Sequence, residues 1–197
     1  MTICHVTPHL PPDQAANALL PAELGRWAAR RGDVVRFLTL EPTQGRRTGD
    51  ELPGTVRRLR RRERAAGLTG LLRVDAWRHA KAVGAALDAI AHDADVLHLH
   101  SNGLIIEAAA AWARHRTRPF VLTLYGTEIW HYRRRWPIDP FTRAYMAANA
   151  VTFYSQRLLD RALSLGLKRH ALSVVYPPVS ESFVALNADP RDAWRRE

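Results

Sequence analysis

Polar residues directly follow four apolar segments of strand length, and their types suit the binding of a polar ligand or an anion. They offer imidazoles, carboxylates, hydroxyls, a side-chain amide and accessible backbone groups. The candidates for substrate binding are His9, Asp13, Gln14, Ala15, Ala16, His100, Ser101, Tyr125, Gly126, Thr127, Glu128, Ser155 and Gln156. The sequence assigns no catalytic residue among them.

The segment Tyr-Gly-Thr-Glu follows the apolar run FVLTL (residues 120–124). Gly126 permits a positive φ or a close ligand approach, while Thr127 and Glu128 add a hydroxyl and a carboxylate. In the alternative interpretation this is a capped turn, with Thr127 as N-cap and Glu128 at the positive end of a helix dipole. With an ordinary pKa of about 10, Tyr125 suits a hydrogen bond to a sugar rather than proton transfer at neutral pH.

The loop after the first apolar segment reads PHLPPDQAAN. Asp13 is expected to cap the helix that carries Ala15 and Ala16, and free amides at that helix end would favour an anion. A capped helix without a ligand is the alternative. His9 lies on the same loop among prolines, where an exposed histidine without a role is also compatible with the sequence.

Several binding motifs are absent from the chain. The first strand is not followed by G-x-G-x-x-G, and no G-x-x-x-x-G-K-S/T occurs, which argues against dinucleotide and P-loop sites. His98 and His100 are two residues apart on a strand and share one face. Because no third ligand stands at the usual spacing, we expect no metal.

Apolar segments of strand length alternate with helical patterns, which is typical of a parallel sheet wrapped by helices. Strands are expected at residues 2–7, 33–40, 54–61, 95–101, 119–124, 150–155 and 172–179. Helices are expected at residues 16–31, 74–90, 104–116 and 156–166. Six or seven strands in this order predict an α/β fold with a doubly wound, mostly parallel sheet, which binds ligands at the carboxyl ends of its strands. The candidate residues lie at those ends.

Arginine dominates the charge of the chain. The 197 residues include 29 basic side chains and carry a formal charge of +10, and only Lys81 and Lys168 are lysine. Anionic partners are compatible with this balance, although a compositional bias toward arginine explains it equally well. Nucleic acid is disfavoured because no recognised module is present and the basic residues are dispersed.

Two clusters of arginines could each bind a specific anionic partner. The run Arg57, Arg58, Arg60, Arg61, Arg62 and Arg64, with Leu68, Leu71 and Leu72 nearby, could attach the domain to an anionic membrane surface. The cluster Arg133, Arg134 and Arg135 could hold an acidic acceptor, or could simply be solvated.

The amino terminus has neither the basic start nor the long apolar stretch of a secretory signal. Cys4 is the single cysteine and lies within an apolar run, as expected of a buried thiol in a protein without disulfides. These features favour a cytoplasmic protein, with peripheral contact to the inner membrane face as an option.

An ordered set of segments resembles the amino-terminal domain of family 4 retaining glycosyltransferases of the GT-B fold. The segments are ICHVTPHLPP, RRGDVVRFLTL, DVLHLHS, RPFVLTLYGTEIW, FYSQRLLDRALSLGL and SVVYPPVSESF. The resemblance implies a Rossmann-like, acceptor-side domain over residues 1–186 and the start of an interdomain linker at 187–197. The carboxyl-terminal domain, which binds the donor nucleotide in that family, would then be absent from the chain.

The resemblance further implies transfer of a sugar with retention, from a nucleotide-sugar donor to an acceptor of unknown identity, without a metal or other cofactor. Because the nucleotide-binding half is missing, activity is expected only together with a second domain. A non-catalytic module that binds a membrane surface or an anionic ligand is the alternative.

Three positions depart from the family pattern within the expected cleft. Ala15 and Ala16 replace a glycine pair near the donor diphosphate, Tyr125 replaces a histidine that contacts the donor sugar, and Glu128 stands where aspartate is common. An added methyl group narrows the approach to backbone amides. The substitutions imply a changed donor choice or a weakened activity.

Overall fold

The computed structural model describes residues 1–42, 51–61, 74–134, 139–168 and 171–177. Its strands are β1 (Thr2–Val6), β2 (Val34–Leu40), β3 (Thr55–Leu59), β4 (Val96–His100), β5 (Phe120–Leu124), β6 (Ala150–Phe153) and β7 (Leu172–Val174). Its helices are α1 (Ala16–Arg30), α3 (Val74–Ile90), α4 (Leu104–His115), α5 (Thr127–Trp130), α6 (Pro140–Ala147) and α7 (Gln156–Ser164).

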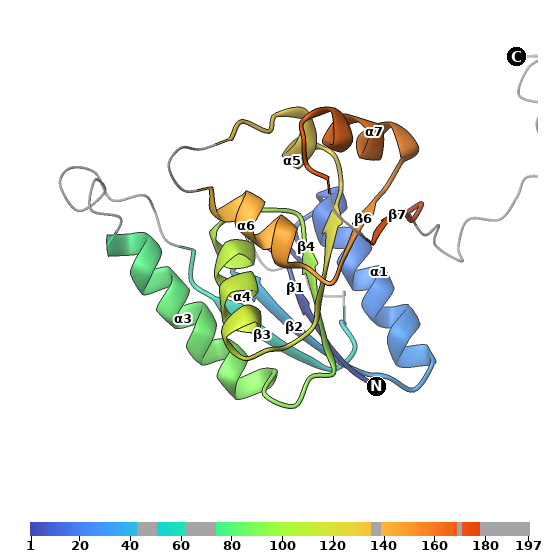
Figure 1. Ribbon diagram of the computed structural model, residues 1–197. Helices are drawn as coiled ribbons and strands as arrows, with labels where there is room; N and C mark the ends of the chain where they lie inside the picture. Colours follow the sequence, from blue (N-terminus) through green and yellow to red (C-terminus); the bar gives the residue numbers. More distant parts are fainter. Residues whose placement is uncertain (43–50, 62–73, 135–138, 169–170, 178–197) are drawn as a thin grey trace, which may run out of the picture.

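The strands form one sheet in the order β3-β2-β1-β4-β5-β6-β7, and every neighbouring pair is parallel. From β1 the chain moves outward to β2 and β3, then returns to β4 on the other side of β1 (Figure 1). The strand order therefore reverses between β1 and β4. Open parallel sheets bind ligands outside the carboxyl ends of the strands at such a point.

Helices cover both faces of the sheet, with α1 on one side and α3 and α4 on the other (Figure 1). The alternation of β2 shows the two layers: Phe37 packs with Leu10 and Ala22, whereas the next residue, Leu38, packs with residues of α3 and α4. Neighbouring residues of a strand face opposite sides, so each layer has its own apolar core.

Helix α1 lies unusually close to β2. A Cβ placed on Gly25 would stand 2.3 Å from Cζ of Phe37, so only glycine fits at this crossing without rearrangement. Phe37 is fully buried and its ring stacks on His5 of β1. The close approach therefore fixes α1 against the strands whose ends carry the β1–α1 loop.

The predicted fold class is confirmed, and each predicted strand is present with shorter bounds. The largest difference is in the last strand, predicted at 172–179, which ends at Val174. The short helix α6 was not predicted, and α5 was implied only by the alternative interpretation of Thr127 as an N-cap. The expected linker at 187–197 lies outside the described residues. Among the residues described, no helix combines the length and the apolar character needed to cross a membrane.

Candidate functional site

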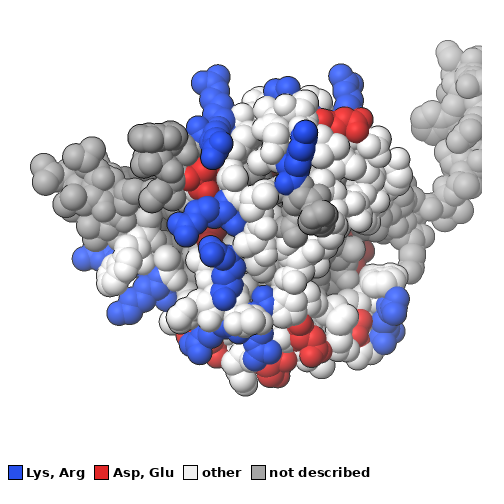
Figure 2. Space-filling view, in the orientation of Figure 1, with Lys and Arg blue, Asp and Glu red and all other residues white. Residues whose placement is uncertain are grey.

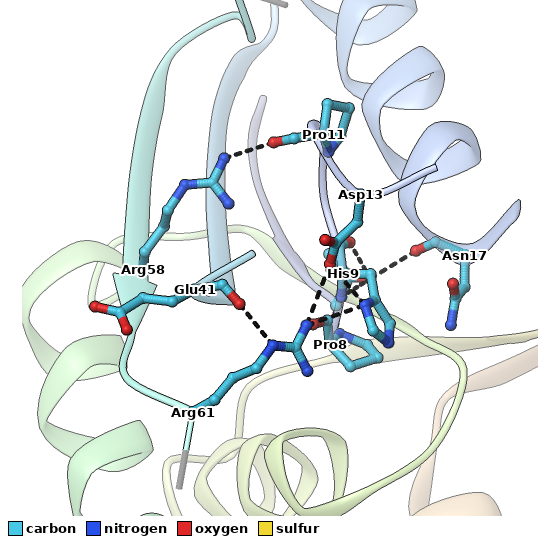
Figure 3. A network of polar contacts seen from close by, with 9 residues as sticks. Pro8, His9, Pro11, Asp13, Asn17, Glu41, Arg58 and Arg61 are labelled. Carbon is cyan, nitrogen blue, oxygen red and sulfur yellow. Dashed lines mark hydrogen bonds and ion pairs between the residues drawn. The ribbon is translucent and has the colours of Figure 1, made fainter. Parts of the chain in front are cut away.

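The β1–α1 loop is held by a network of polar contacts at the carboxyl edge of the sheet (Figure 3). Nδ1 of His9 lies 2.8 Å from Oδ2 of Asp13, and Nη2 of Arg61 lies 3.2 Å from the same oxygen. Arg61 also donates to the carbonyls of Pro8 (3.0 Å) and Glu41 (2.6 Å). Arg61, which follows β3, thus connects the β1–α1 loop to the edge of the sheet.

Asp13 orients the imidazole of His9. Arg61 lies 3.0 Å from Nδ1 of His9, but its guanidinium is always protonated and its charge is matched by the Asp13 carboxylate. A proton on Nδ1 is therefore best directed at Asp13, which leaves Nε2 as the nitrogen available to a ligand. The His9 side chain is 27% exposed and that of Asp13 only 4%, so the carboxylate is the buried anchor of the pair.

The expectation that Asp13 caps α1 is wrong. The N-cap is Ala15, whose side chain makes no capping hydrogen bond. Asp13 precedes the cap by two residues and bonds to His9 and Arg61 instead. The N-cap residue of the 15-residue helix α1 thus contributes no side-chain hydrogen bond, an arrangement that favours an anion at this end.

Tyr125 lies directly after β5 and covers a buried histidine. Its hydroxyl is 2.7 Å from Nδ1 of His100, and its ring meets the edge of the Tyr154 ring at 4.7 Å. Burial, followed by the nearby Tyr154 and Glu128, raises the pKa of Tyr125 above its ordinary value. Tyr125 is therefore protonated at neutral pH and acts here as a hydrogen-bonding group.

The backbone turns sharply at Gly126, whose φ of 151° lies in the region that favours glycine. Gly126 is the N-cap of α5, so the interpretation of Thr127 as N-cap is wrong; Thr127 is the exposed first residue of that helix. Glu128 lies in the first turn, as expected from the dipole argument, and its Oε2 accepts from the Gly126 amide at 2.8 Å. Its buried Oε1 has no partner among the described residues.

The remaining candidates divide between buried and exposed positions. His100 is fully buried behind Tyr125, and Ser101 is buried with a left-handed φ of 72°. Ser155 is the N-cap of α7 and accepts from the amide of Leu158 at 3.2 Å, whereas Gln156 and the loop residue Gln14 are exposed. The Ser155 side chain thus caps its own helix. Substrate binding by the whole set stays a prediction.

The arginine clusters are only partly available to a partner. Arg58 donates to the carbonyl of Pro11 at 2.7 Å and Arg61 holds the β1–α1 loop, whereas Arg57 and Arg60 are exposed. Basic side chains are spread over the visible face of the molecule, with acidic ones among them (Figure 2). Arg133 and Arg134 are exposed. The other predicted contacts, Arg62, Arg64, Leu68, Leu71, Leu72 and Arg135, lie outside the described residues.

Three histidines lie together beneath the carboxyl edge, where the sequence indicated only two. His5 of β1 is the direct partner of His98 in β4, and His100 follows two residues later on the same face. Nδ1 of His5 lies 2.9 Å from Nε2 of His100, and Nε2 of His98 lies 2.6 Å from Oγ1 of Thr123. The expectation that no third ligand accompanies His98 and His100 is therefore wrong.

Burial lowers the pKa of all three imidazoles, to about 4 for His98 and well below the ordinary value for His5 and His100. All three are neutral at neutral pH. The third histidine escaped the sequence analysis because the pairing of β1 with β4 joins residues that are distant in sequence. Alignment of ICHV with VLHLH in parallel register is the signal that would have found it.

The chain belongs to glycosyltransferase family 4. The model of this family, described as Glycosyltransferase Family 4, matches residues 21–183 and so covers most of the chain. No curated protein matches the chain.

Solved structures share the fold at low sequence identity. Sucrose-phosphate synthase from Thermosynechococcus elongatus aligns with a TM-score of 0.64 and 13% identity, over 98% of this chain and 52% of that one. HepE of Anabaena in complex with UDP aligns with a TM-score of 0.62 and 12% identity, over 100% and 49% of the two chains. UDP-GlcNAc 2-epimerase from Methanocaldococcus jannaschii aligns with a TM-score of 0.55 and 10% identity, over 89% and 45%.

The chain thus spans about half the length of these proteins. At such identities the likeness establishes the fold alone, and it includes an epimerase as well as a synthase. The class of protein is set by the family match, and the reaction must be argued from the site.

Proposed function

We propose that this chain is the amino-terminal, acceptor-side domain of a glycosyltransferase that moves a sugar from a nucleotide-sugar donor to an acceptor with retention. The observation that carries the proposal is the family 4 match over residues 21–183. A second domain would supply the donor nucleotide site and complete the cleft, and we do not expect transfer by residues 1–186 alone.

The carboxyl edge of the sheet supports this function. The β1–α1 loop brings an oriented imidazole, His9, beside an α1 terminus without a side-chain cap. Two strands away, Tyr125 and Gly126 stand at the end of β5. The α1 terminus and His9 offer hydrogen-bond donors that suit a phosphate. The residues after β5 offer hydroxyl groups that suit a sugar. The structure of HepE with UDP makes a uridine nucleotide the first donor to test.

The three departures from the family pattern define how the donor would be held. The methyl group of Ala15, where the family pattern has glycine, would keep the diphosphate farther from the α1 terminus. Tyr125 places a protonated hydroxyl against His100 at the end of β5, where the family pattern has an imidazole. Glu128 is bonded to the Gly126 amide, so its role would be to shape the turn rather than to contact the sugar.

The test is turnover of the full-length protein with a panel of nucleotide sugars, with the anomeric configuration of the product followed by NMR. We expect one or a few donors to be used and the configuration of the donor to be kept. Failure with every donor, or an inverted product, would contradict the proposal.

The contribution of Tyr125 is tested by Tyr125→Phe and Tyr125→His. We expect Phe to lower turnover about tenfold, because a hydrogen bond of roughly 1–1.5 kcal/mol is lost. Tyr176→Phe is the control, since Tyr176 is 72% exposed and lies away from β5 in the sheet. Equal rates for Tyr and Phe at position 125 would show that the hydroxyl contacts nothing important in the reaction.

We further propose that the protein acts in the cytoplasm and that the transfer itself uses no metal. Exposed arginines such as Arg57 and Arg60 would permit peripheral contact with an anionic membrane. Cosedimentation with acidic vesicles tests the membrane contact. Binding that survives replacement of both arginines by glutamine would refute this site.

A further inference from the structure

The three buried histidines form a cluster that the proposed transferase does not use. His5, His98 and His100 each offer one ring nitrogen, and these three atoms all lie within 4.8 Å of one another. The rings are packed together, with centroids 4.0 Å apart for His98 and His100 and 5.2 Å apart for His5 and His100. Two hydrogen-bonded strands, β1 and β4, hold them in this arrangement.

We propose that His5, His98 and His100 form a binding site for a divalent transition-metal ion of the zinc type. Neutral imidazole is the ligand preferred by zinc, copper, nickel and cobalt. Three protein nitrogens leave one coordination position for water or another small ligand. The site lies under the carboxyl edge, includes the candidate His100, and lies directly behind the proposed donor contact Tyr125.

The spacing of the nitrogens supports an ion of this size. Zinc–nitrogen bonds of about 2.0–2.1 Å place tetrahedral ligands roughly 3.4 Å apart. The His5 and His100 nitrogens are 2.9 Å apart, and none of the three ligand atoms lies more than 4.8 Å from another. Binding therefore requires His5 and His100 to separate slightly and give up their mutual hydrogen bond, and His98 to move inward.

The outer hydrogen bonds already fix two of the rings. Nε2 of His98 contacts Thr123, whose hydroxyl contacts Thr152 at 2.7 Å. Nδ1 of His100 contacts the hydroxyl of Tyr125. These bonds leave Nδ1 of His98 and Nε2 of His100 for the ion. Partners of this kind orient histidine ligands in metal sites and set their tautomers.

His5 supplies an independent sign that the cluster is incomplete. It is 2% exposed, and its Nε2 has no hydrogen-bond partner among the described residues. Buried polar atoms nearly always have a partner. Since the nitrogen of His5 that faces His100 is Nδ1, an ion would satisfy Nε2 only after the His5 ring turns so that Nε2 faces the other two histidines.

The face of the sheet that holds the histidines is not fully buried at β4, β5 and β6. His98, Val121 and Ala150 lie side by side on β4, β5 and β6 and are each only partly buried. Their neighbours on the opposite face, such as Leu97, Leu122 and Val151, are fully buried. The ion can therefore reach His98 from the partly exposed face of the sheet.

The test uses Co²⁺ and Zn²⁺ salts with the purified, untagged protein after treatment with a chelator. We expect one equivalent of Co²⁺ to produce the visible absorption of a four-coordinate site, and Zn²⁺ to displace it. X-ray absorption of the zinc-loaded wild-type protein should show three imidazole ligands. Lack of binding at one equivalent, or a zinc shell with fewer than three imidazoles, would overturn the proposal.

Matched variants locate the site. His98→Gln, at the most exposed of the three positions, should weaken metal binding by more than about 100-fold. Tyr125→Phe should weaken it by roughly 10- to 100-fold, because His100 loses its hydrogen-bond partner. His92→Gln is the control, because the His92 side chain is 69% exposed and lies outside the cluster. Binding unchanged by His98→Gln would contradict the assignment. The readout is metal binding alone, so it is independent of the transferase proposal.

Discussion

At the scale of single residues, the contact between Tyr125 and His100 joins a candidate binding residue at the end of β5 to a buried histidine of β4. The Tyr125 hydroxyl is the one group in the described structure recorded within hydrogen-bond distance of Nδ1 of His100, at 2.7 Å. We expect Tyr125→Phe to lower the free energy of unfolding by about 1–3 kcal/mol, because a buried imidazole nitrogen loses its partner. Urea unfolding measures this change.

The control for that measurement is Tyr176→Phe. Tyr176 is 72% exposed, and a surface change of this kind is expected to alter stability by less than about 0.5 kcal/mol. Equal effects of the two substitutions would mean that water replaces the tyrosine hydroxyl at His100.

Cys4 is a residue whose environment predicts chemical inertness. It is fully buried in the centre of β1, and burial raises its pKa from 9.0 to about 12. At pH 8 the thiolate fraction is then lower than in the unfolded chain by roughly 1000-fold, and the thiolate is the reactive form. We expect alkylation by iodoacetamide to be at least that much slower in the native protein than in denaturant. Rapid native alkylation would show that β1 opens locally.

At the scale of elements, the crossing of α1 over β2 depends on Gly25. Alanine there would place Cβ within 2.3 Å of the Phe37 ring, and that ring is held between the helix and His5. We expect Gly25→Ala to cost about 1–3 kcal/mol through overpacking, more than the gain in helix propensity. Thermal or urea unfolding provides the measurement.

Gly84 in α3 is the matched control for Gly25. The nearest atom to a Cβ at Gly84 is Cδ1 of Trp112, at an ordinary 3.7 Å. Gly84→Ala should therefore stabilise the protein by up to about 1 kcal/mol. If both alanine variants stabilise the protein, the proximity of α1 to Phe37 is not a constraint on the fold.

The β1–α1 loop depends on a residue that follows β3. Arg61→Gln removes the ion pair with Asp13 and weakens the bonds to Pro8 and Glu41. We expect faster amide hydrogen exchange in residues 7–14 and a stability loss of about 1–3 kcal/mol, since the carboxylate is largely buried. Arg60→Gln, at the exposed neighbouring position, should change neither quantity. Unchanged amide exchange in Arg61→Gln would show that Arg61 does not anchor the β1–α1 loop.

The elements themselves were largely predictable, for a physical reason. Strands of a parallel sheet are buried on both faces, so DVLHLH and FVLTL stand out as apolar runs between helical patterns. Helix α5 spans only four residues, too short for a periodic pattern. Helix α6 carries a recognisable start, Asp139 as N-cap and Pro140 at its first position, which the sequence analysis passed over.

The site was less predictable than the fold, because its contacts join distant segments. The loop residues His9 and Asp13 could be identified from their position after a strand, but their partner Arg61 comes 48 residues after Asp13. His5 and His100 are likewise 95 residues apart and meet only because β1 pairs with β4. Sequence periodicity gives the face of each residue and says nothing about strand order.

At the scale of the whole molecule, the position of each strand in the sheet predicts how stability is distributed. The strands β1, β4 and β5 have neighbours on both sides and end in consecutive buried residues. The edge strand β7 has three residues, and none of them is fully buried. Local opening costs least where few apolar contacts and one strand partner hold the backbone.

We therefore expect amide hydrogen exchange to be slowest in β1, β4 and β5, near the limit set by global unfolding, and fastest among the strands in β7. The loops that carry His9 and Tyr125 would then emerge from the most stable part of the sheet, which is the condition for holding a ligand in a defined geometry. Exchange measured by mass spectrometry on the native protein gives this order directly. Uniform protection across all seven strands would instead indicate that the sheet opens only as one unit, so that the site would be no more rigid than the edge.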